Sequence, residues 1–311
     1  MRTPVHEWHG REIAQRIGTS TTVVLKLELF QHTGTFKARG AVSVVGLLDA
    51  DARRRGVTAV SAGNHAIATA YAAQCFDCSA KVVMMASANA ARRQRAKEYS
   101  AEVVIAKDGA TAFAIAQELA EREGRHFVHP FEGPLVAQGT ATLGLELMEQ
   151  APQLDAVIVP IGGGGLCAGV STAVRLLSER CRVYGVEPEG ADAMHRSFAA
   201  GGPLTGLQNT TIADSLAPPM TTPYAYELCR KNVHQLVRVS DSEIIDAMAL
   251  LFREMKLAVE PAGAASTAAL LGPLRTELEG KKVGLIVCGA NIDIESFSAH
   301  VRSSIERSGA L

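Results

Sequence analysis

The stretch Val24–Val42 reads VLKLELFQHTGTFKARGAV and combines a strand, a turn and the start of a helix. Its first part is rich in β-branched and large apolar residues that alternate with polar ones, which predicts a strand. Thr33-Gly34 interrupts that pattern, and a helix carrying Lys37 follows. A lysine amine withdrawn from water loses its proton more readily and can form a Schiff base with an aldehyde. By position alone a solvated surface lysine is the commoner outcome, so other segments must decide.

The overall composition is that of an ordinary globular protein. The chain has 311 residues, 47% of them hydrophobic and 20% charged, with a formal net charge of -1. This length suffices for one large or two modest domains, and the charge balance favours neither nucleic acid nor an anionic membrane as a partner. The first residues, MRTPVHEWHG, lack a signal-peptide core, and no apolar run is long enough to span a bilayer. We therefore expect a cytoplasmic protein.

The cysteines do not form a recognisable disulfide or zinc pattern. They are Cys75, Cys78, Cys167, Cys181, Cys229 and Cys288. The pair at 75 and 78 is a lone C-x-x-C, whereas a zinc site would need a second pair or histidines at ligand spacing. Reduced, structural thiols are the interpretation that fits a cytosolic chain.

Short β-branched runs alternate with alanine-rich amphipathic segments along almost the whole chain. Strands are predicted at Val23–Glu28, Val57–Val60, Lys81–Met85, Glu102–Ile105, Ala156–Pro160, Arg182–Val186, Gln235–Val239 and Lys282–Cys288. Helices are predicted at Ala66–Cys75, Ala90–Tyr99, Thr111–Glu123, Val136–Gln150, Leu166–Leu177, Asp241–Lys256 and Gly263–Leu271. This alternation predicts an α/β fold with mostly parallel sheets and helices on both faces. Ligands bind such folds at the carboxyl ends of the strands.

Four glycines follow one predicted strand and precede a helix. Gly162, Gly163, Gly164 and Gly165 let several backbone N–H groups converge on one phosphate at the positive end of the helix that begins with Leu166. The run does not fit the nucleoside-triphosphate loop G-x-x-x-x-G-K-[ST], and it fits the dinucleotide pattern G-x-G-x-x-G poorly. A flexible loop without a ligand remains the alternative.

A second loop of this kind is Ser61-Ala62-Gly63-Asn64-His65. It also lies between a predicted strand and a helix, where free N–H groups attract an anion. Asn64 is equally suited to cap that helix, so the loop is a weak signal by itself.

Together these segments resemble the fold-type II pyridoxal-phosphate enzymes, and specifically the serine/threonine dehydratase and serine racemase family. The family pattern K-x-E followed by T-G-S-F-K-x-R-G-A appears as Lys26-Leu27-Glu28 and Thr33–Ala41, with Thr35 in place of the usual serine. The resemblance implies the tryptophan synthase β-like fold, pyridoxal 5′-phosphate as cofactor, and Lys37 as the catalytic lysine that holds it. It also implies a homodimer.

The same resemblance assigns further residues to the site. It implies that Phe36 lies beside the cofactor, that Asn64 bonds its 3′-oxygen and that Gly162–Gly165 with Leu166 hold its phosphate. Ser61, Ala62, Asn64 and His65 are expected to grip the substrate carboxylate. Glu260, in Glu260-Pro261-Ala262-Gly263, matches a family glutamate near the cofactor ring, and Ile212–Ser215 resembles a segment close to the substrate.

Cys288 stands where the family usually has a serine facing the pyridine nitrogen, in Cys288-Gly289-Ala290-Asn291. A thiol is a weaker hydrogen-bonding group than a hydroxyl. Unlike an aspartate, either residue leaves the ring nitrogen largely unprotonated, which favours elimination over chemistry that needs a long-lived carbanion. A buried inert cysteine at a strand end is the alternative.

Some members of the family bind a divalent cation at the segment that corresponds to Glu187–Ala193. The second acidic ligand would fall on Ala193, which has no carboxylate, and Asp192 is one residue out of place. Hard cations need several oxygen ligands, so we expect no metal here and interpret Glu187 as a capping or paired carboxylate.

Ala62 separates the two activities of the family. Racemases have a serine there that acts on the opposite face of the substrate from the lysine, and alanine can neither give nor take a proton. We therefore expect a dehydratase that converts an L-β-hydroxy amino acid such as L-threonine or L-serine to a 2-oxo acid and ammonia. A racemase or another β-elimination enzyme on this scaffold is the alternative, and a non-catalytic phosphate- or nucleotide-binding protein is the alternative from another class.

The chain is predicted to have two domains. The charged turn Asp49–Gly56 and the stretch His129–Pro134 are candidate boundaries. With the resemblance, they predict a large cofactor-binding domain of residues 1–50 and 134–311 and a small mobile substrate-loop domain of residues 51–133.

Overall fold

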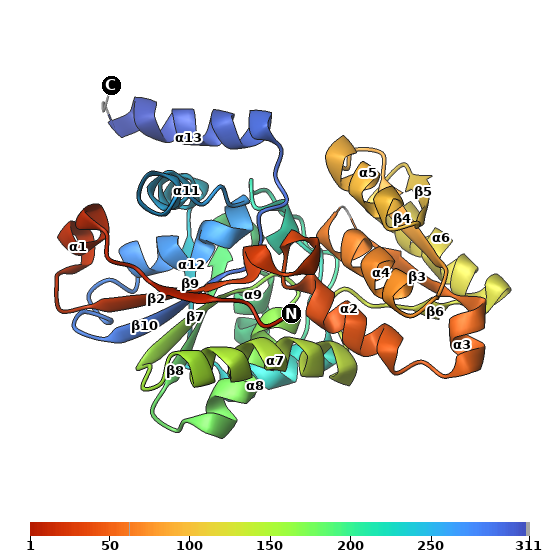
Figure 1. The fold of residues 1–311 in the computed structure, drawn as a ribbon, viewed down its shortest axis with the longest axis horizontal. Coiled ribbons are helices and arrows are strands. Elements are labelled where there is room, and N and C mark those ends of the chain that lie inside the picture. Colours follow the sequence, from red (N-terminus) through yellow and green to blue (C-terminus); the bar gives the residue numbers. More distant parts are fainter. Residues whose placement is uncertain (62, 309–311) are drawn as a thin grey trace.

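The computed structural model describes residues 1–61 and 63–308, and for Ala110 the backbone alone. Two sheets organise the chain (Figure 1). The larger has six strands in the order β1 (Val5–Glu7), β2 (Thr22–Leu27), β10 (Lys282–Val287), β7 (Ala156–Pro160), β8 (Arg182–Pro188) and β9 (Gln235–Val239). Its strands are parallel except that β1 runs antiparallel to β2. The smaller sheet is parallel and has the order β5 (Glu102–Ala106), β4 (Ala80–Met85), β3 (Val57–Val60) and β6 (His126–Phe127).

Helices cover both faces of the larger sheet. On one face lie α12 (Pro261–Leu271), α11 (Asp241–Met255), α13 (Ile294–Ser308) and α1 (Arg11–Ile17), and on the other lie α7 (Pro134–Gln150), α8 (Gly165–Leu177) and α10 (Pro223–Asn232) (Figure 1). We call this sheet with its helices the large lobe, and it includes α9 (Ala193–Ala200) and α2 (Lys37–Gly46). The strands read as apolar runs because helices exclude water from both sides.

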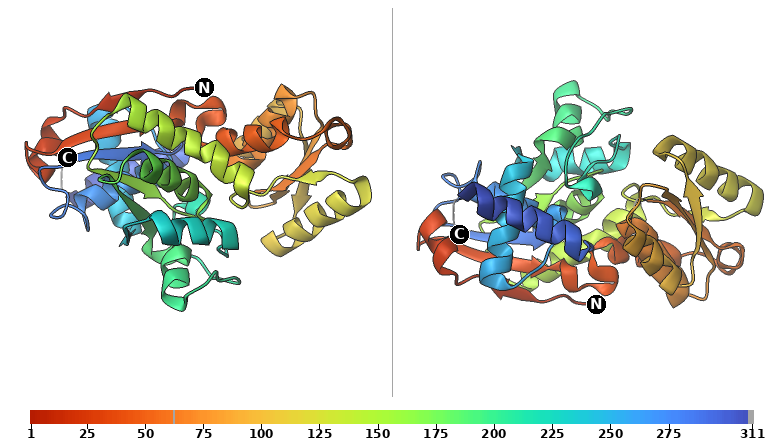
Figure 2. Two further views of the ribbon diagram at one scale, coloured as in Figure 1. Left: turned by 90° about the horizontal axis from the view of Figure 1, so that it is seen from below. Right: turned by 90° about the horizontal axis from the view of Figure 1, so that it is seen from above.

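The smaller sheet lies between α4 (Asn64–Cys75) with α5 (Ala90–Glu98) on one face and α6 (Gly109–Glu123), yellow in Figure 2, on the other. We call this sheet with its helices and α3 (Ala50–Arg55) the small lobe. Short 3₁₀ turns occur at Glu28–Phe30, His32–Gly34, Glu189–Ala191 and Asp214–Leu216. All four strands of the small sheet lie between residues 57 and 127, whereas the large sheet takes strands from both sides of that segment. The domain boundaries given above stay a prediction.

Each lobe has its own apolar core. Leu25, Ile158 and Leu285 are buried in the large sheet, and Val57, Val82 and Ala70 are buried in the small lobe. The parallel register brings the carboxyl ends of β2, β7 and β10 to the same edge of the large sheet. The segments after these three strands therefore meet at that edge, as expected for a site in an α/β fold.

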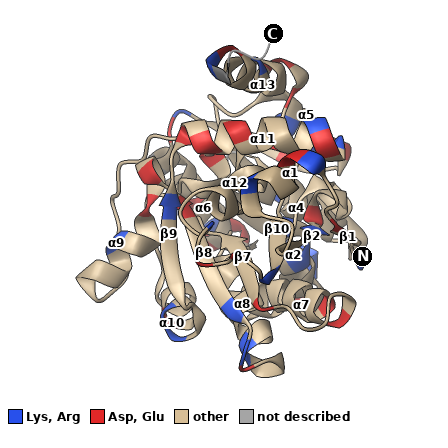
Figure 3. Cartoon of the chain, turned by 90° about the vertical axis from the view of Figure 1, so that its left-hand side faces the viewer, with Lys and Arg blue, Asp and Glu red and all other residues tan. Residues whose placement is uncertain are grey.

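The surface carries charges of both signs. Lysines and arginines are interspersed with aspartates and glutamates on the side drawn in Figure 3, including along α11. Across residues 1–61 and 63–308, no helix combines the length and apolar character that a membrane span requires.

Candidate active site

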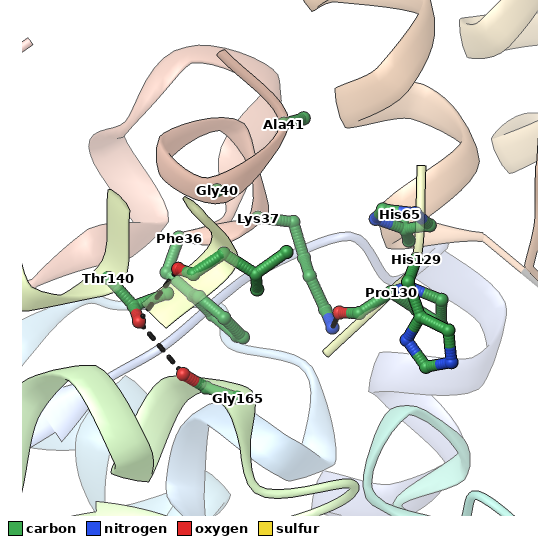
Figure 4. A pocket seen from close by; sticks show the side chains of 10 residues that line it. Phe36, Lys37, Gly40, Ala41, His65, His129, Pro130, Thr140 and Gly165 are labelled. Carbon is green, nitrogen blue, oxygen red and sulfur yellow. Dashed lines mark hydrogen bonds between the residues drawn. The ribbon is translucent and has the colours of Figure 1, made fainter. Parts of the chain in front are cut away.

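Lys37 is the first residue of α2 and points into a cavity between the two lobes. Its Nζ donates a hydrogen bond of 2.6 Å to the carbonyl of Pro130, and the rings of His65 and His129 lie beyond it (Figure 4). Some of its surface faces the open cavity, yet its ammonium is surrounded by protein. This desolvation lowers the pKa of Lys37 to about 8. Near neutral pH the amine can therefore give up its proton at little cost.

A buried network of charges anchors the helix that carries Lys37. The guanidinium of Arg39 contacts Glu28 through Nε and Nη2, both at 2.8 Å, and contacts Glu146 at 2.7 and 2.8 Å. The ammonium of Lys26 bonds Glu146 at 2.8 Å and the carbonyl of Thr3 at 2.8 Å. Two cations face two carboxylates here, so each buried charge is paired. Lys26 and Glu28 of K-x-E and Arg39 of F-K-x-R thus hold the base of α2 in place.

The turn before Lys37 is held against the loop that follows β10. Thr33 and Gly34 have φ values of 72° and 76°, a left-handed conformation that is unusual for threonine. The amide of Asn291 donates to the Thr33 carbonyl at 2.9 Å, and the N–H of Phe36 donates to the Cys288 carbonyl at 3.1 Å. These bonds place Lys37 beside the carboxyl end of β10.

The four glycines between β7 and α8, which we call the glycine loop, are close-packed on all sides. A Cβ at Gly162 would lie 3.1 Å from the Cα of Leu216, and one at Gly164 would lie 2.6 Å from Met194. Gly164 also has a φ of 94°, a conformation that favours glycine. The loop therefore needs glycine for reasons of space as well as backbone freedom.

Phe131 and Thr140 complete the surroundings of this loop. A Cβ at Gly163 would collide with the Phe131 ring, and one at Gly165 would lie 2.6 Å from the Phe131 carbonyl oxygen. The Thr140 hydroxyl donates to the Gly165 carbonyl at 2.8 Å (Figure 4). The glycine loop thus lines the cavity at the N-terminus of α8, and helix N-termini are suited to bind a phosphate.

Asn64 links the small lobe to the opposite wall of the cavity. Its Nδ2 donates to both oxygens of Glu260, at 2.8 and 3.1 Å, and its Oδ1 accepts from Asn291 at 2.8 Å. Glu260 is 2% exposed, and burial raises its pKa to about 7 although the nearby Arg92 lowers it. This carboxyl therefore changes its charge near neutral pH.

Cys288 follows β10 directly and lines the same cavity as Lys37, Glu260 and the glycine loop. The residue is 2% exposed, and burial together with the Glu260 carboxylate raises the pKa of its thiol well above the ordinary range. The group is a neutral thiol at neutral pH and can act as a weak hydrogen-bond donor.

The loop Ser61–His65, which we call the substrate loop, is described except for Ala62. The Ser61 hydroxyl accepts a bond of 3.0 Å from the N–H of Gly63. The His65 ring bonds the Val128 carbonyl at 2.8 Å, and burial lowers its pKa to about 3. His65 is therefore neutral and donates through Nε2, so its side chain is engaged away from the glycine loop. The prediction for Ala62 falls outside the described residues.

The structure brings most of the predicted residues together. The cavity wall contains Phe36, Lys37, Asn64, Gly162, Gly163, Gly164, Gly165, Leu166, Glu260 and Cys288. It also contains Phe131 and Leu216, which the sequence analysis did not assign to the site. The stretch around Phe131 is predicted from the sequence as a domain boundary. This stretch follows the parallel strand β6, and segments after parallel strands are where ligands bind, so the position of Phe131 did point to the site. Ser61 and His65 do not line this cavity, although His65 lines a small space on the other side of Lys37.

Comparison with known proteins shows the protein family to which this chain belongs. The family description "Pyridoxal-phosphate dependent enzyme" matches residues 1–289. The chain belongs to this family. It is 58% identical over 281 residues to a phenylserine dehydratase from Ralstonia pickettii, covering 90% of this chain and 86% of that protein. It is 37% identical over 292 residues to an L-threonine ammonia-lyase from Thermotoga maritima, covering 94% and 72%.

The fold is also that of a solved relative. The structure of maize serine racemase superimposes with a TM-score of 0.89 at 33% identity, covering 97% of this chain and 93% of that one. The predictions of a fold-type II pyridoxal-phosphate fold and of pyridoxal 5′-phosphate as cofactor are confirmed.

The residues present fit this cofactor. The glycine loop offers an N–H-lined cradle for a phosphate, and Lys37 offers an amine of lowered pKa for an aldehyde. The neutral thiol of Cys288 suits a pyridine nitrogen that carries no proton. The described residues bring these three groups together in one cavity.

The predicted interpretation of Glu187 is confirmed. Its carboxylate accepts hydrogen bonds of 2.7 and 2.8 Å from the N–H groups of Met194 and His195, in the first turn of α9. It is buried, and this desolvation raises its pKa to about 8. Glu187 is a helix cap, which satisfies two N–H groups that the helix leaves without partners.

Proposed function

We propose that this enzyme is a dehydratase, or ammonia-lyase, that converts an L-3-hydroxy amino acid to a 2-oxo acid and ammonia. The observation that carries the proposal is the position of the Lys37 amine, enclosed between the glycine loop, Cys288 and Glu260 in one cavity. The similarity of the chain to a phenylserine dehydratase and to an L-threonine ammonia-lyase supports the reaction type.

Lys37 is proposed as the single base of the reaction. Bound pyridoxal phosphate supplies the electron sink that makes the Cα proton acidic. Lys37 accepts that proton at Nζ, and the β-hydroxyl leaves as water when it takes up a proton, which the Lys37 ammonium can return. Water then releases the nitrogen as ammonia, so the substrate loses NH₃ overall and becomes a 2-oxo acid. The low pKa of Lys37 suits this exchange of protons near neutral pH.

The remaining predicted residues are proposed to position the reactants. We assign Phe36, Asn64, the glycine loop, Leu166, Glu260 and Cys288 to the cofactor. We assign the substrate loop to the substrate carboxylate, mainly through the N–H groups at the start of α4. Ala62 offers no hydroxyl opposite the lysine, which favours one-base dehydration over racemisation.

The lining favours an apolar β-substituent. Phe36, Phe131 and Leu216 provide apolar surface in the cavity, and the described residues that line it include one cation, Lys37. Arg92 lies nearby, but Asp214 and Glu260 already pair with it. An acidic substituent would therefore find no cation other than Lys37 among the described lining residues to pair with. We infer a preference for an aryl substituent such as that of phenylserine, with L-threonine and L-serine as poorer substrates.

A substrate panel tests this proposal. L-phenylserine, L-threonine, L-serine and L-threo-3-hydroxyaspartate are incubated with the holoenzyme, and 2-oxo acid and ammonia are measured. We expect kcat/KM to fall in that order. Equal or greater turnover of hydroxyaspartate would contradict the inferred selectivity, and formation of D-serine from L-serine without 2-oxo acid would assign the chain to the racemases.

Three wider expectations are kept as proposals. The balanced composition supports a cytoplasmic location, and the family resemblance supports a homodimer. The insertion of the small sheet between segments of the large one supports a small lobe that moves relative to the large lobe.

A further inference from the structure

Arg92, at the start of α5 in the small lobe, contacts three separate segments of the large lobe. Its Nη1 donates to Asp214 at 2.5 Å, its Nε donates to the Asn291 carbonyl at 2.9 Å, and its Nη2 lies 3.4 Å from Glu260. These partners belong to the loop after α9, the loop after β10 and the residue before α12. The Arg92 side chain is 11% exposed; its partner Glu260 is buried, whereas Asp214 is exposed at the rim of the contact.

The stem of Arg92 also covers the substrate loop. A Cβ at Gly63 would lie 3.1 Å from Nε of Arg92, and closer still to its Cδ. Gly63 therefore fits under this side chain because it has none of its own. One residue thus touches the substrate loop with its stem and the large lobe with its head.

We propose that Arg92 is a positioning residue that holds the small lobe closed on the large lobe and so keeps Gly63 and Asn64 over the cavity. Closure of this kind completes a binding site and excludes water from it. The proposal assigns no chemical step to Arg92. It rests on the proposed function for its kinetic arm alone.

The chemistry of the side chain suits this role. A guanidinium is planar and offers five N–H donors in a fixed fork, so it can serve three acceptors in different directions at once. The other polar ties near it are made by neutral amides, from Asn89 to Asp293 at 2.6 Å and from Asn64 to Glu260. Arg92 brings the positive charge that balances Asp214 and Glu260 across the gap between the lobes.

The neighbouring arginine provides a matched control. Arg93 lies on the same helix and donates to the Ala86 carbonyl at 3.0 Å, within the small lobe. Arg93→Gln removes the same charge from the same helix without touching the large lobe. Arg92→Lys keeps a charge but offers a single centre in place of the fork.

The test combines kinetics with amide hydrogen exchange of the holoenzyme. In Arg92→Gln we expect KM for L-phenylserine to rise by roughly tenfold or more, because the closed state that binds substrate becomes less populated. Exchange at residues 63–66 and 89–95 should accelerate, while strands β7 and β10 stay protected. Arg92→Lys should be intermediate, and Arg93→Gln should match the wild type in both measurements.

The exchange arm separates this proposal from the dehydratase proposal. If the wild type turns over no hydroxy amino acid, faster exchange in Arg92→Gln still supports the tie between the lobes. Wild-type exchange at residues 63–66 in Arg92→Gln would overturn it, as would an equal effect of Arg93→Gln. If Arg92→Gln fails to fold, Asp214→Asn decides by the same two measurements, with a smaller change expected in the same direction.

Discussion

The two walls of the cavity are built by different kinds of interaction. On the large-lobe wall, the glycine loop is packed against Phe131, Leu216 and Met194 so closely that a Cβ would collide with them. On the small-lobe wall, Asn64 and Arg92 reach across the cavity by hydrogen bonds and ion pairs to residues of the other lobe.

This difference indicates which properties each wall controls. Close packing fixes the shape of a surface and penalises any added atom, so the large-lobe wall is suited to one invariant ligand. Polar ties between lobes can break and re-form without unfolding either lobe. The small-lobe wall is therefore suited to opening for a substrate and closing over it. The predictions below test the two walls separately.

The largest effect is expected from Lys37→Ala, on the large-lobe wall. Loss of the amine removes the proposed attachment point of the cofactor and the proposed base, and loss of a general base alone costs roughly 10²- to 10⁴-fold in rate. We expect turnover to disappear and the visible absorbance of the bound cofactor to change. Absorbance spectra of the purified variant and 2-oxo acid detection check both outcomes.

Lys26→Met is the control for this change. Lys26 is also a buried lysine of the same sequence motif, and burial lowers its pKa. Its ammonium, however, bonds Glu146 and the Thr3 carbonyl and does not line the cavity. We expect a lower unfolding midpoint with the cofactor absorbance retained. If the Lys37→Ala enzyme keeps its turnover, Lys37 is not the base.

A smaller effect is expected from Gly165→Ala. The added Cβ would lie 2.6 Å from the backbone carbonyl of Phe131, so the loop or that backbone must shift. Overpacking of this kind costs about 1–3 kcal/mol, or roughly 5- to 150-fold in an equilibrium constant. We expect cofactor affinity to fall within that range, measured by titrating the apoenzyme with pyridoxal phosphate.

Gly202→Ala is the matched control for the glycine loop. No atom lies within 4 Å of a Cβ built at Gly202, so that substitution should leave cofactor affinity unchanged. Equal affinity in the two variants would mean that the large-lobe wall is adaptable rather than close-packed.

The sequence predicts the longer strands and the glycine loop, whereas the short strands β1 and β6 were not predicted. The predicted bounds Val57–Val60, Ala156–Pro160 and Gln235–Val239 coincide with β3, β7 and β9. Apolar runs buried on both faces leave a strong signal, and glycine loops between a strand and a helix depend on local chemistry. Local sequence therefore locates the glycine loop, whereas Asn64, Glu260 and Cys288 were assigned through the family resemblance and Phe131 and Leu216 were not assigned.

The hydrogen bonds and ion pairs between the lobes could not be predicted from local sequence. Arg92 and Asp214 are 122 residues apart, and neither has a local pattern that names its partner. The helices α1, α3, α9, α10 and α13 were not predicted. In α13 a signal was present, because Ile294, Phe297, Val301 and Ile305 recur at helical spacing. Contacts of long sequence separation need the fold before they can be assigned.

The smallest expected effect is on pH dependence and concerns Glu260, the large-lobe partner of Asn64 and Arg92 on the small-lobe wall. Glu260 is faced by Arg92 of α5, Asp214 of the 3₁₀ turn Asp214–Leu216, Lys37 of α2 and the Cys288 thiol. Burial raises its pKa to about 7, so its carboxylate is present above that pH. Both carboxylate oxygens accept from Asn64, and protonation removes one acceptor. We expect kcat/KM of the wild type to fall as the pH drops through about 7.

Glu260→Gln should remove this acid limb and leave a lower, flatter profile, since the amide keeps one acceptor oxygen and does not titrate. Stability should move in the opposite direction. The folded protein binds the Glu260 proton more tightly than the unfolded chain, whose glutamate titrates near 4.5, so this group's contribution to the free energy of unfolding is full below that pH and is lost as the pH rises through about 7. Denaturant unfolding at pH 5 and pH 8 should show a smaller difference in the variant. If kcat/KM of Glu260→Gln still falls as the pH drops through about 7, another group is responsible for the titration. The hydrogen bonds between Asn64 and Glu260 would then not control substrate binding.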